Sequence, residues 1–149
     1  MQRSISAGAS LEHLATFRDF VEAACREAGV ADERVIFGLK LAVDEAVTNI
    51  VTHGYRDLPP TPIHLDFDST PDQITLTLSD RGRAFDPADA PPPDLSPDWK
   101  HRRVGGLGLY FLQHMVDDVR YETDSQQINH LTLIKWIRHE GMENHGADL

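Results

Sequence analysis

The sequence has little cysteine and no long apolar segment. Cys25 is the single cysteine among 149 residues, so an intramolecular disulfide and a thiolate metal cluster are excluded. We expect Cys25 to be a small core residue. No apolar run approaches the roughly 20 residues that span a bilayer, and the N-terminal residues lack the apolar core of a secretory signal. Together these absences predict a soluble protein of the cytoplasm.

Basic residues are also few. The 14 Lys and Arg residues stand against 24 Asp and Glu residues, which gives a formal net charge of −10. A strongly acidic surface repels phosphate backbones, so direct binding of nucleic acid is not expected. The balance of 40% hydrophobic and 26% charged residues is that of an ordinary globular protein. The length fits one domain, which we expect over residues 1–138, followed by a polar tail over 139–149.

Hydrophobic periodicity predicts helices and strands along the chain. A helix capped by Ser10 runs to a stop at Gly29, and a second begins near Asp32 and ends before Gly54. Strict alternation of apolar and polar residues elsewhere predicts strands. The expected strands cover residues 3–7, 63–68, 74–79, 119–123 and 131–137.

A proline-rich segment divides the chain. Prolines at positions 87, 91, 92, 93 and 97 prevent a regular helix or central strand, so we expect a loop or lid over about 86–105. A glycine-led helix over 105–119 follows it. The order of these elements predicts an α+β two-layer sandwich, with a mixed, mainly antiparallel sheet and helices on one face.

Glu45 and Asn49 lie four residues apart on the second predicted helix, so their side chains share one face. Asparagine is a mediocre helix former, and its presence within a helix calls for an explanation. One interpretation is a solvated polar face. The other is a site for a hard cation, because a carboxamide oxygen suits Mg²⁺ that also binds phosphate oxygens.

Asp80 and Gly82 directly follow a predicted strand. A carboxylate at this place can accept a hydrogen bond from an exocyclic amine, while glycine lets a ligand ring approach the backbone. The alternative is an ordinary turn, because Asp-x-Gly is common turn chemistry.

The run Gly105, Gly106, Leu107 and Gly108 stands at the start of the last predicted helix. Glycines there let backbone N–H groups face an anion. The alternative is a flexible hinge and a helix start. The run is not a P-loop, because no Gly-Lys-Ser/Thr follows, and it lacks a strand leading directly into the glycines.

The motifs together resemble the Bergerat-type (GHKL) ATPases, which include histidine kinases, Hsp90-type chaperones and gyrase. The most similar branch is the anti-sigma factor serine/threonine kinases. The stretches LAVDEAVTNIVTHGY, LSDRGRAFDP and GGLGLYFLQHMVDDV carry the resemblance, which extends from the first strand to Ile137. His53 and Tyr55 match the family pattern, and we interpret them mainly as packing or loop residues.

The resemblance implies a role for each motif residue. Asn49 would ligate Mg²⁺ between the ATP phosphates, and Glu45 would be the general base for the attacking hydroxyl. Asp80 would bind the adenine amino group, and Gly82 would line the base. The glycine run with Leu107 would hold phosphates, with Gly105 easing closure of the lid.

Some positions remain open. Arg102 or Arg103 in the lid would meet the γ-phosphate, and we favour Arg103. Either Asn129 or Thr132 would supply a polar contact near adenine, and we favour Thr132. Arg83 stands where histidine kinases have a second glycine, which favours the anti-sigma branch over a histidine-kinase domain.

The resemblance implies a Mg-ATP-dependent protein serine kinase. It would phosphorylate an anti-anti-sigma protein with a STAS domain and sequester an RNA polymerase sigma factor, and it would form a homodimer. The alternative is a non-catalytic ATP-binding regulator that switches partners.

Overall fold

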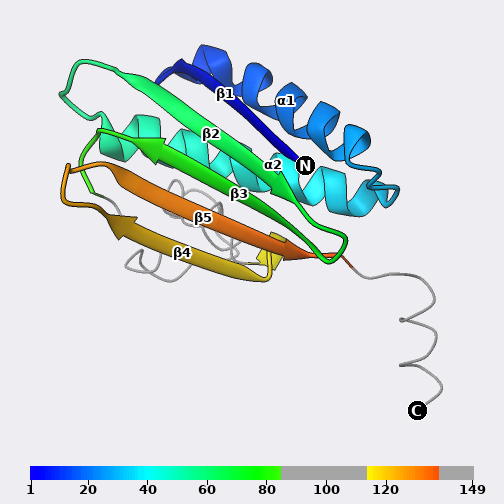
Figure 1. Ribbon diagram of the computed structural model, residues 1–149. Helices are drawn as coiled ribbons and strands as arrows, with labels where there is room; N and C mark the ends of the chain where they lie inside the picture. Colours follow the sequence, from blue (N-terminus) through cyan, green and yellow to red (C-terminus); the bar gives the residue numbers. More distant parts are fainter. Residues whose placement is uncertain (85–113, 138–149) are drawn as a thin grey trace, which may run out of the picture.

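Five strands form one antiparallel sheet, and two helices cover one of its faces (Figure 1). The computed structural model describes residues 1–84 and 114–137. The strands are β1 (Gln2–Gly8), β2 (Pro62–Ser69), β3 (Gln73–Asp80), β4 (Asp118–Thr123) and β5 (Asn129–Trp136). Their order across the sheet is β1-β2-β3-β5-β4, and every pair is antiparallel. The predicted α+β sandwich is confirmed, although no parallel pair occurs within the described residues.

The first helical segment begins with a 3₁₀ turn. This turn, η1 (Leu11–His13), is capped by the Ser10 hydroxyl, which accepts a hydrogen bond of 3.3 Å from the Glu12 N–H. The helix α1 (Leu14–Glu27) follows it. The predicted cap is therefore present, but it caps the 3₁₀ turn. The predicted stop at Gly29 is confirmed, because this residue has a φ of +85°, which favours glycine.

The second helix, α2 (Glu33–Asn49), begins after Asp32, whose carboxylate accepts a hydrogen bond of 2.9 Å from the Arg34 N–H. This is an ordinary N-cap, as the sequence predicted. A π-helical turn, η2 (Ile50–Gly54), continues it, so the helical segment reaches Gly54 with its geometry changed after Asn49. No helix within the described ranges is long and apolar enough to cross a membrane.

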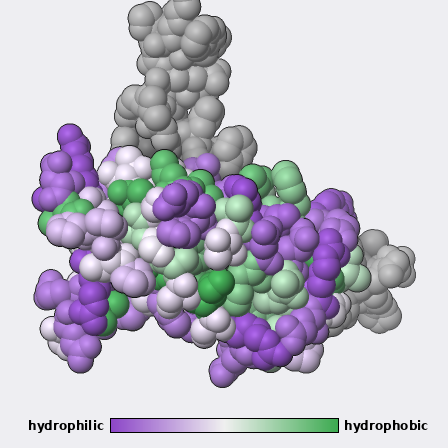
Figure 2. All heavy atoms as spheres, turned by 90° about the horizontal axis from the view of Figure 1, so that it is seen from above, coloured by the Kyte–Doolittle hydropathy of each residue, from purple (hydrophilic) through white to green (hydrophobic). Residues whose placement is uncertain are grey.

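The core lies between the helices and the inner face of the sheet. Its fully buried side chains come from both layers; they include Phe17 and Val21 of α1, Leu39 and Val43 of α2, and Leu65, Leu76, Leu78 and Leu133 of the sheet. Cys25 is also fully buried, as predicted. On the face seen in Figure 2, hydrophilic residues (purple) alternate with smaller hydrophobic areas (green).

The strand period places one polar pair on the inner face. In β3 the buried positions are Ile74, Leu76, Leu78 and Asp80. Asp80 is paired with Asn129 of β5, and directly opposed residues share a face. Asp80 and Asn129 therefore lie on the same inner face as the apolar core residues, at the position where β3 ends.

Candidate functional site

Asn49 is the last residue of α2, and only 7% of its surface is exposed. Its side-chain Nδ2 is buried and has no hydrogen-bond partner among the described residues. A buried polar group without a partner destabilises a fold by about 1–3 kcal/mol. Such a group is retained where a ligand completes its contacts. The unpartnered Nδ2 is a donor, so it fits a ligand that brings an acceptor such as a phosphate oxygen. The predicted role of Asn49 toward Mg²⁺ would use its other atom, the carboxamide oxygen.

Glu45 lies one turn before Asn49 on α2 and is partly buried. Burial raises the pKa of the Glu45 carboxyl, and the nearby charge of Asp44 raises it further. Asp44 itself forms an ion pair of 2.9 Å with Arg18 of α1, so it belongs to the contact between the helices. A half-buried carboxylate with a raised pKa is suited to accepting a proton.

The π-helical turn η2 brings Gly54 against the loop after β3. The Arg83 N–H donates a hydrogen bond of 2.7 Å to the Gly54 carbonyl oxygen. A β-carbon on Gly82 would lie 2.7 Å from that same oxygen, which is closer than real β-carbons approach. Gly82 is therefore required by the backbone of Gly54, a reason that the sequence pattern did not contain. π-helical turns of this kind are frequent at functional sites.

Tyr55 joins the same two segments through its side chain. Its hydroxyl oxygen accepts a hydrogen bond of 3.0 Å from the Arg81 N–H and lies 2.5 Å from the Thr61 hydroxyl. Only 7% of Tyr55 is exposed, which agrees with its predicted packing role. Hydrogen bonds thus join the segment 53–55, which follows α2, to the segment 80–83 at the end of β3.

Asp80 is nearly buried, with 6% of its surface exposed. Its Oδ1 accepts hydrogen bonds from the Gly82 N–H at 2.8 Å and from the Asn129 Nδ2 at 3.0 Å. Burial raises the pKa of the Asp80 carboxyl, and these two hydrogen bonds oppose that rise. Both bonds end on Oδ1, so Oδ2 is left as an acceptor that no described residue uses.

Thr132 does not lie beside Asp80. It is paired with Thr77, at alternate positions of β5 and β3 that face away from the helices. Asn129, by contrast, is only 2% exposed and contacts Asp80 directly. The structure therefore does not bring Thr132 together with Asp80, because side chains on a strand alternate between the two faces. Asn129 is the polar residue of β5 at the site.

Several predicted site residues lie outside the described residues. These are Arg102, Arg103, Gly105, Gly106, Leu107 and Gly108, together with the predicted lid. The predicted site residues brought together in the described part are the pair on α2 and the pair after β3. No group of three or more metal-ligating acids, histidines or cysteines occurs among the described side chains. A Mg²⁺ ion that takes most of its ligands from phosphates and water needs no such group.

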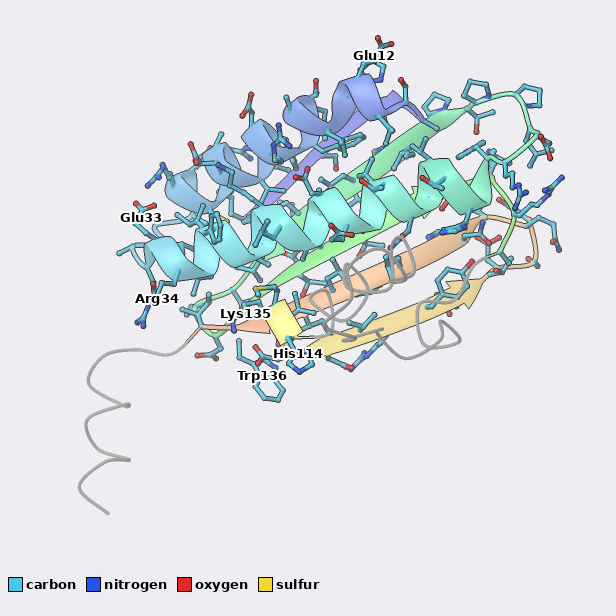
Figure 3. The ribbon with its side chains drawn as sticks, turned by 180° about the vertical axis from the view of Figure 1, so that it is seen from behind. Glu12, Glu33, Arg34, His114, Lys135 and Trp136 are labelled. Carbon is cyan, nitrogen blue, oxygen red and sulfur yellow. The ribbon has the colours of Figure 1, made fainter. Side chains whose placement is uncertain are left out.

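A cavity of about 790 Å³ lies at the other end of α2. It is bordered by the α1–α2 connection, the β2–β3 turn and the end of β5, where Arg34, Lys135 and Trp136 lie near one another in Figure 3. Its charges are paired, because Lys135 lies 3.7 Å from Asp117 and Arg34 lies 3.5 Å from Asp32. None of the predicted site residues that lie within residues 1–84 and 114–137 lines this cavity.

Comparison with known proteins agrees with this arrangement. Residues 7–135 match the histidine kinase-like ATPase domain family. The chain is 36% identical over 100 residues to the serine/threonine-protein kinase BtrW of Bordetella bronchiseptica, covering 67% of this chain and 70% of that protein. It is 32% identical over 144 residues to the serine-protein kinase RsbW of Staphylococcus epidermidis, covering 93% and 88%.

A solved structure shares the fold. The structure of the RsbU and RsbW domains of Rv1364c from Mycobacterium tuberculosis matches with a TM-score of 0.65 at 20% identity, covering 93% of this chain. This chain spans 33% of that longer protein.

The chain therefore belongs to the histidine kinase-like ATPase domain family. Within that family it groups with serine/threonine-protein kinases of the RsbW and BtrW kind. At the level of the family, this confirms the predicted ATP-dependent kinase of the anti-sigma factor type.

Proposed function

We propose that the chain is a Mg-ATP-dependent serine kinase that phosphorylates a STAS-type anti-anti-sigma protein and, in its other state, sequesters a sigma factor. The observation that carries this proposal is the buried amide of Asn49 one turn beyond Glu45, whose donor Nδ2 has no hydrogen-bond partner among the described residues and so can receive a phosphate oxygen. The Gly54 backbone connects this part of α2 to the Asp80 loop. Membership of the kinase family supports the same assignment.

Each residue has a distinct part in the proposed reaction. Asn49 holds Mg²⁺ through its carboxamide oxygen, and Asp80 accepts a hydrogen bond from the adenine amine through Oδ2. Glu45 takes the proton of the serine hydroxyl as the bond from the serine oxygen to the γ-phosphorus forms. The bond from the γ-phosphorus to the β–γ bridging oxygen breaks, and ADP leaves. When bound, Mg²⁺ neutralises phosphate charge. Phosphoryl transfer of this kind depends mainly on positioning and charge stabilisation.

The proposal extends to the organisation of the protein. Residues 1–138 form one ATP-binding kinase domain with its lid over about 86–105, and residues 139–149 form a polar tail. The protein acts in the cytoplasm as a homodimer, with no direct contact to nucleic acid or membrane. Light scattering at tens of micromolar protein tests the dimer, and a monomer mass contradicts it.

Phosphotransfer tests the catalytic assignment. Radiolabelled ATP is incubated with the cognate STAS protein and with wild type, Glu45→Ala, Asn49→Ala or Asp19→Asn, whose side chain is exposed on α1. We expect transfer by wild type and Asp19→Asn and its loss in the two site variants. No transfer by wild type, or full transfer by Glu45→Ala, contradicts the assignment. Tight ATP binding without transfer supports the non-catalytic alternative.

The partners are tested by affinity capture from the source cells with and without ATP. We expect a sigma factor and a small STAS protein, with a balance that changes with the nucleotide. Recovery of neither contradicts the proposed partner switch.

A further inference from the structure

The side-chain amide of Asn129 is fully hydrogen-bonded beside the Asp80 loop, because its NH₂ group donates two hydrogen bonds and its oxygen accepts one. Its Nδ2 donates to Asp80 Oδ1 at 3.0 Å and to the Gly82 carbonyl oxygen at 2.8 Å. Its Oδ1 accepts from the Thr123 hydroxyl at 2.8 Å. Three strand and loop segments are thus joined by one side chain that is 2% exposed.

This arrangement allows only one orientation of the amide. Rotation by 180° would place the Asn129 oxygen against two acceptors, the Asp80 carboxylate and the Gly82 carbonyl. It would also turn the NH₂ group toward the Thr123 hydroxyl. Two hydrogen bonds would be replaced by contacts between acceptors in a buried place, where unpaired polar groups are most unfavourable. The donor is therefore held toward Asp80.

The fixed donor decides which oxygen of Asp80 remains for a ligand. Oδ1 is occupied by the Gly82 N–H and by Asn129, whereas Oδ2 has no partner among the described residues. A carboxylate held in this way is only an acceptor, and it selects a base that presents a donor. We propose that Asn129 is a positioning residue that makes the site specific for a 6-aminopurine over a 6-oxopurine, by holding Asp80 as an acceptor. This inference rests on the proposed function, and it assigns Asn129 a role distinct from direct contact with the base.

The loss of Asn129 would change the chemistry of Asp80. The buried Asp80 carboxyl already has a raised pKa, and the hydrogen bond from Asn129 opposes that rise. Without this bond the carboxyl binds a proton at higher pH, and a protonated carboxyl donates to a keto oxygen. Discrimination against a 6-oxopurine is then lost along with affinity for the 6-aminopurine.

Inosine diphosphate and adenosine diphosphate are the probes that isolate this effect, because their bases differ at the group on C6. Dissociation constants for Mg-ADP and Mg-IDP are measured for wild type, Asn129→Ala and the control Thr77→Ala, which lies on the opposite face of the sheet. We expect Asn129→Ala to weaken ADP binding about tenfold or more, the range for a hydrogen bond to a charged group. We expect the ADP/IDP ratio to fall similarly, with Thr77→Ala behaving as wild type.

Asn129→Asp is a second variant of nearly the same shape. It places a second carboxylate within about 3.0 Å of Asp80. At neutral pH the two negative charges repel each other, and at lower pH one bound proton restores the hydrogen bond between the two groups. We expect its ADP affinity to increase as pH falls, whereas wild-type affinity stays nearly constant over the same range. A purely structural role of Asn129 does not produce this change in pH profile.

A measurement without nucleotide separates the inference from the proposed function. The pKa of the Asp80 carboxyl is followed by carbon NMR in the free protein, and we expect it to be higher in Asn129→Ala than in wild type. An unchanged Asp80 titration, or an unchanged ADP/IDP ratio in folded Asn129→Ala, overturns the inference alone. A wild type that binds neither nucleotide overturns the proposed function, and the specificity role with it.

Discussion

A β-carbon on Gly82 would lie 2.7 Å from the carbonyl oxygen of Gly54 and 3.1 Å from Oδ1 of Asp80. The close packing of Gly54 therefore requires a glycine at position 82, directly after β3. The backbone of the turn after α2 occupies the space of any side chain. This contact fixes the Asp80 loop relative to the helix that carries Glu45 and Asn49.

Gly82→Ala tests this contact. The added methyl group must displace the Gly54 backbone, and we expect the free energy of unfolding to fall by about 1–3 kcal/mol, together with nucleotide affinity. Gly38→Ala is the matched control. A β-carbon at Gly38 would meet Met115 Sδ at 3.6 Å, which is ordinary contact, and a helical Gly→Ala change adds about 0.5–1 kcal/mol of stability. Urea unfolding measures both, and equal stability of the two variants contradicts the prediction.

Asn49→Ala is expected to separate stability from binding. The substitution removes a buried amide whose Nδ2 has no hydrogen-bond partner in the part of the chain that the structure describes, so the free protein should melt no lower than wild type. Stabilisation by Mg-ADP should disappear, whereas a ligand at a hundred times its Kd contributes about 2.7 kcal/mol to wild type. Thermal unfolding with ADP, with and without Mg²⁺, measures this. An Asn49→Ala protein that keeps the Mg²⁺-dependent shift argues against the ligand role.

The pH dependence of phosphotransfer should report the pKa of Glu45. A general base acts when ionised, so the rate should fall as pH decreases through the raised pKa of this carboxyl. Asp44→Asn removes the neighbouring negative charge that contributes to the rise. We therefore expect the acid limb of the pH–rate profile to move to lower pH in Asp44→Asn and to stay in place in Asp19→Asn. A shift in the opposite direction contradicts the assignment of Glu45.

The same raised pKa predicts an effect on stability. The folded protein disfavours the ionised form of Glu45, so its destabilising contribution is fully present above the raised pKa and disappears below the ordinary value of 4.5. Glu45→Gln should unfold at a higher temperature than wild type at neutral pH, and the difference should shrink toward acid pH. Calorimetry across this range measures it. A difference that grows with falling pH has the wrong sign.

The helices and strands were predictable because the spacing of buried apolar residues differs between a helix and a strand. The boundaries that matter for the site were less predictable. The sequence predicted that the last strand begins at Leu131, and asparagine at position 129 is a residue depleted in strands. In the structure β5 begins at Asn129, because pairing with Asp80 extends the ladder.

The chemistry of the site was predictable only in part. Glu45, Asn49 and Asp80 belong to short motifs whose residue types indicate their use. Contacts between distant segments have no local pattern, so the Gly54–Gly82 approach and the Tyr55–Arg81 hydrogen bond were missed. The preference for Thr132 over Asn129 depended on the face of β5. That face follows from pairing with β3 and not from composition.

Tyr55→Phe tests the second of these contacts. It leaves the Arg81 N–H without the acceptor that it has at 3.0 Å. A typical hydrogen bond contributes about 0.5–1.5 kcal/mol to stability. Thr61→Val is the comparison, because it removes the other partner of the hydroxyl and leaves the Arg81 bond intact. Urea unfolding should show the larger loss for Tyr55→Phe. Equal losses for the two variants contradict a specific role of the Arg81 bond.

The pairing of β3 with β5 links the polar site to the distant core. A one-residue slip of β5 would bring His130 beside Asp80 in place of Asn129, and it would also turn Leu131 and Leu133 from the core to the open face. These two leucines are 5% and 0% exposed, so the slip would expose a large apolar area. Hydrophobic burial therefore selects the one strand alignment in which Asp80, the proposed base-binding acid, has its amide partner Asn129.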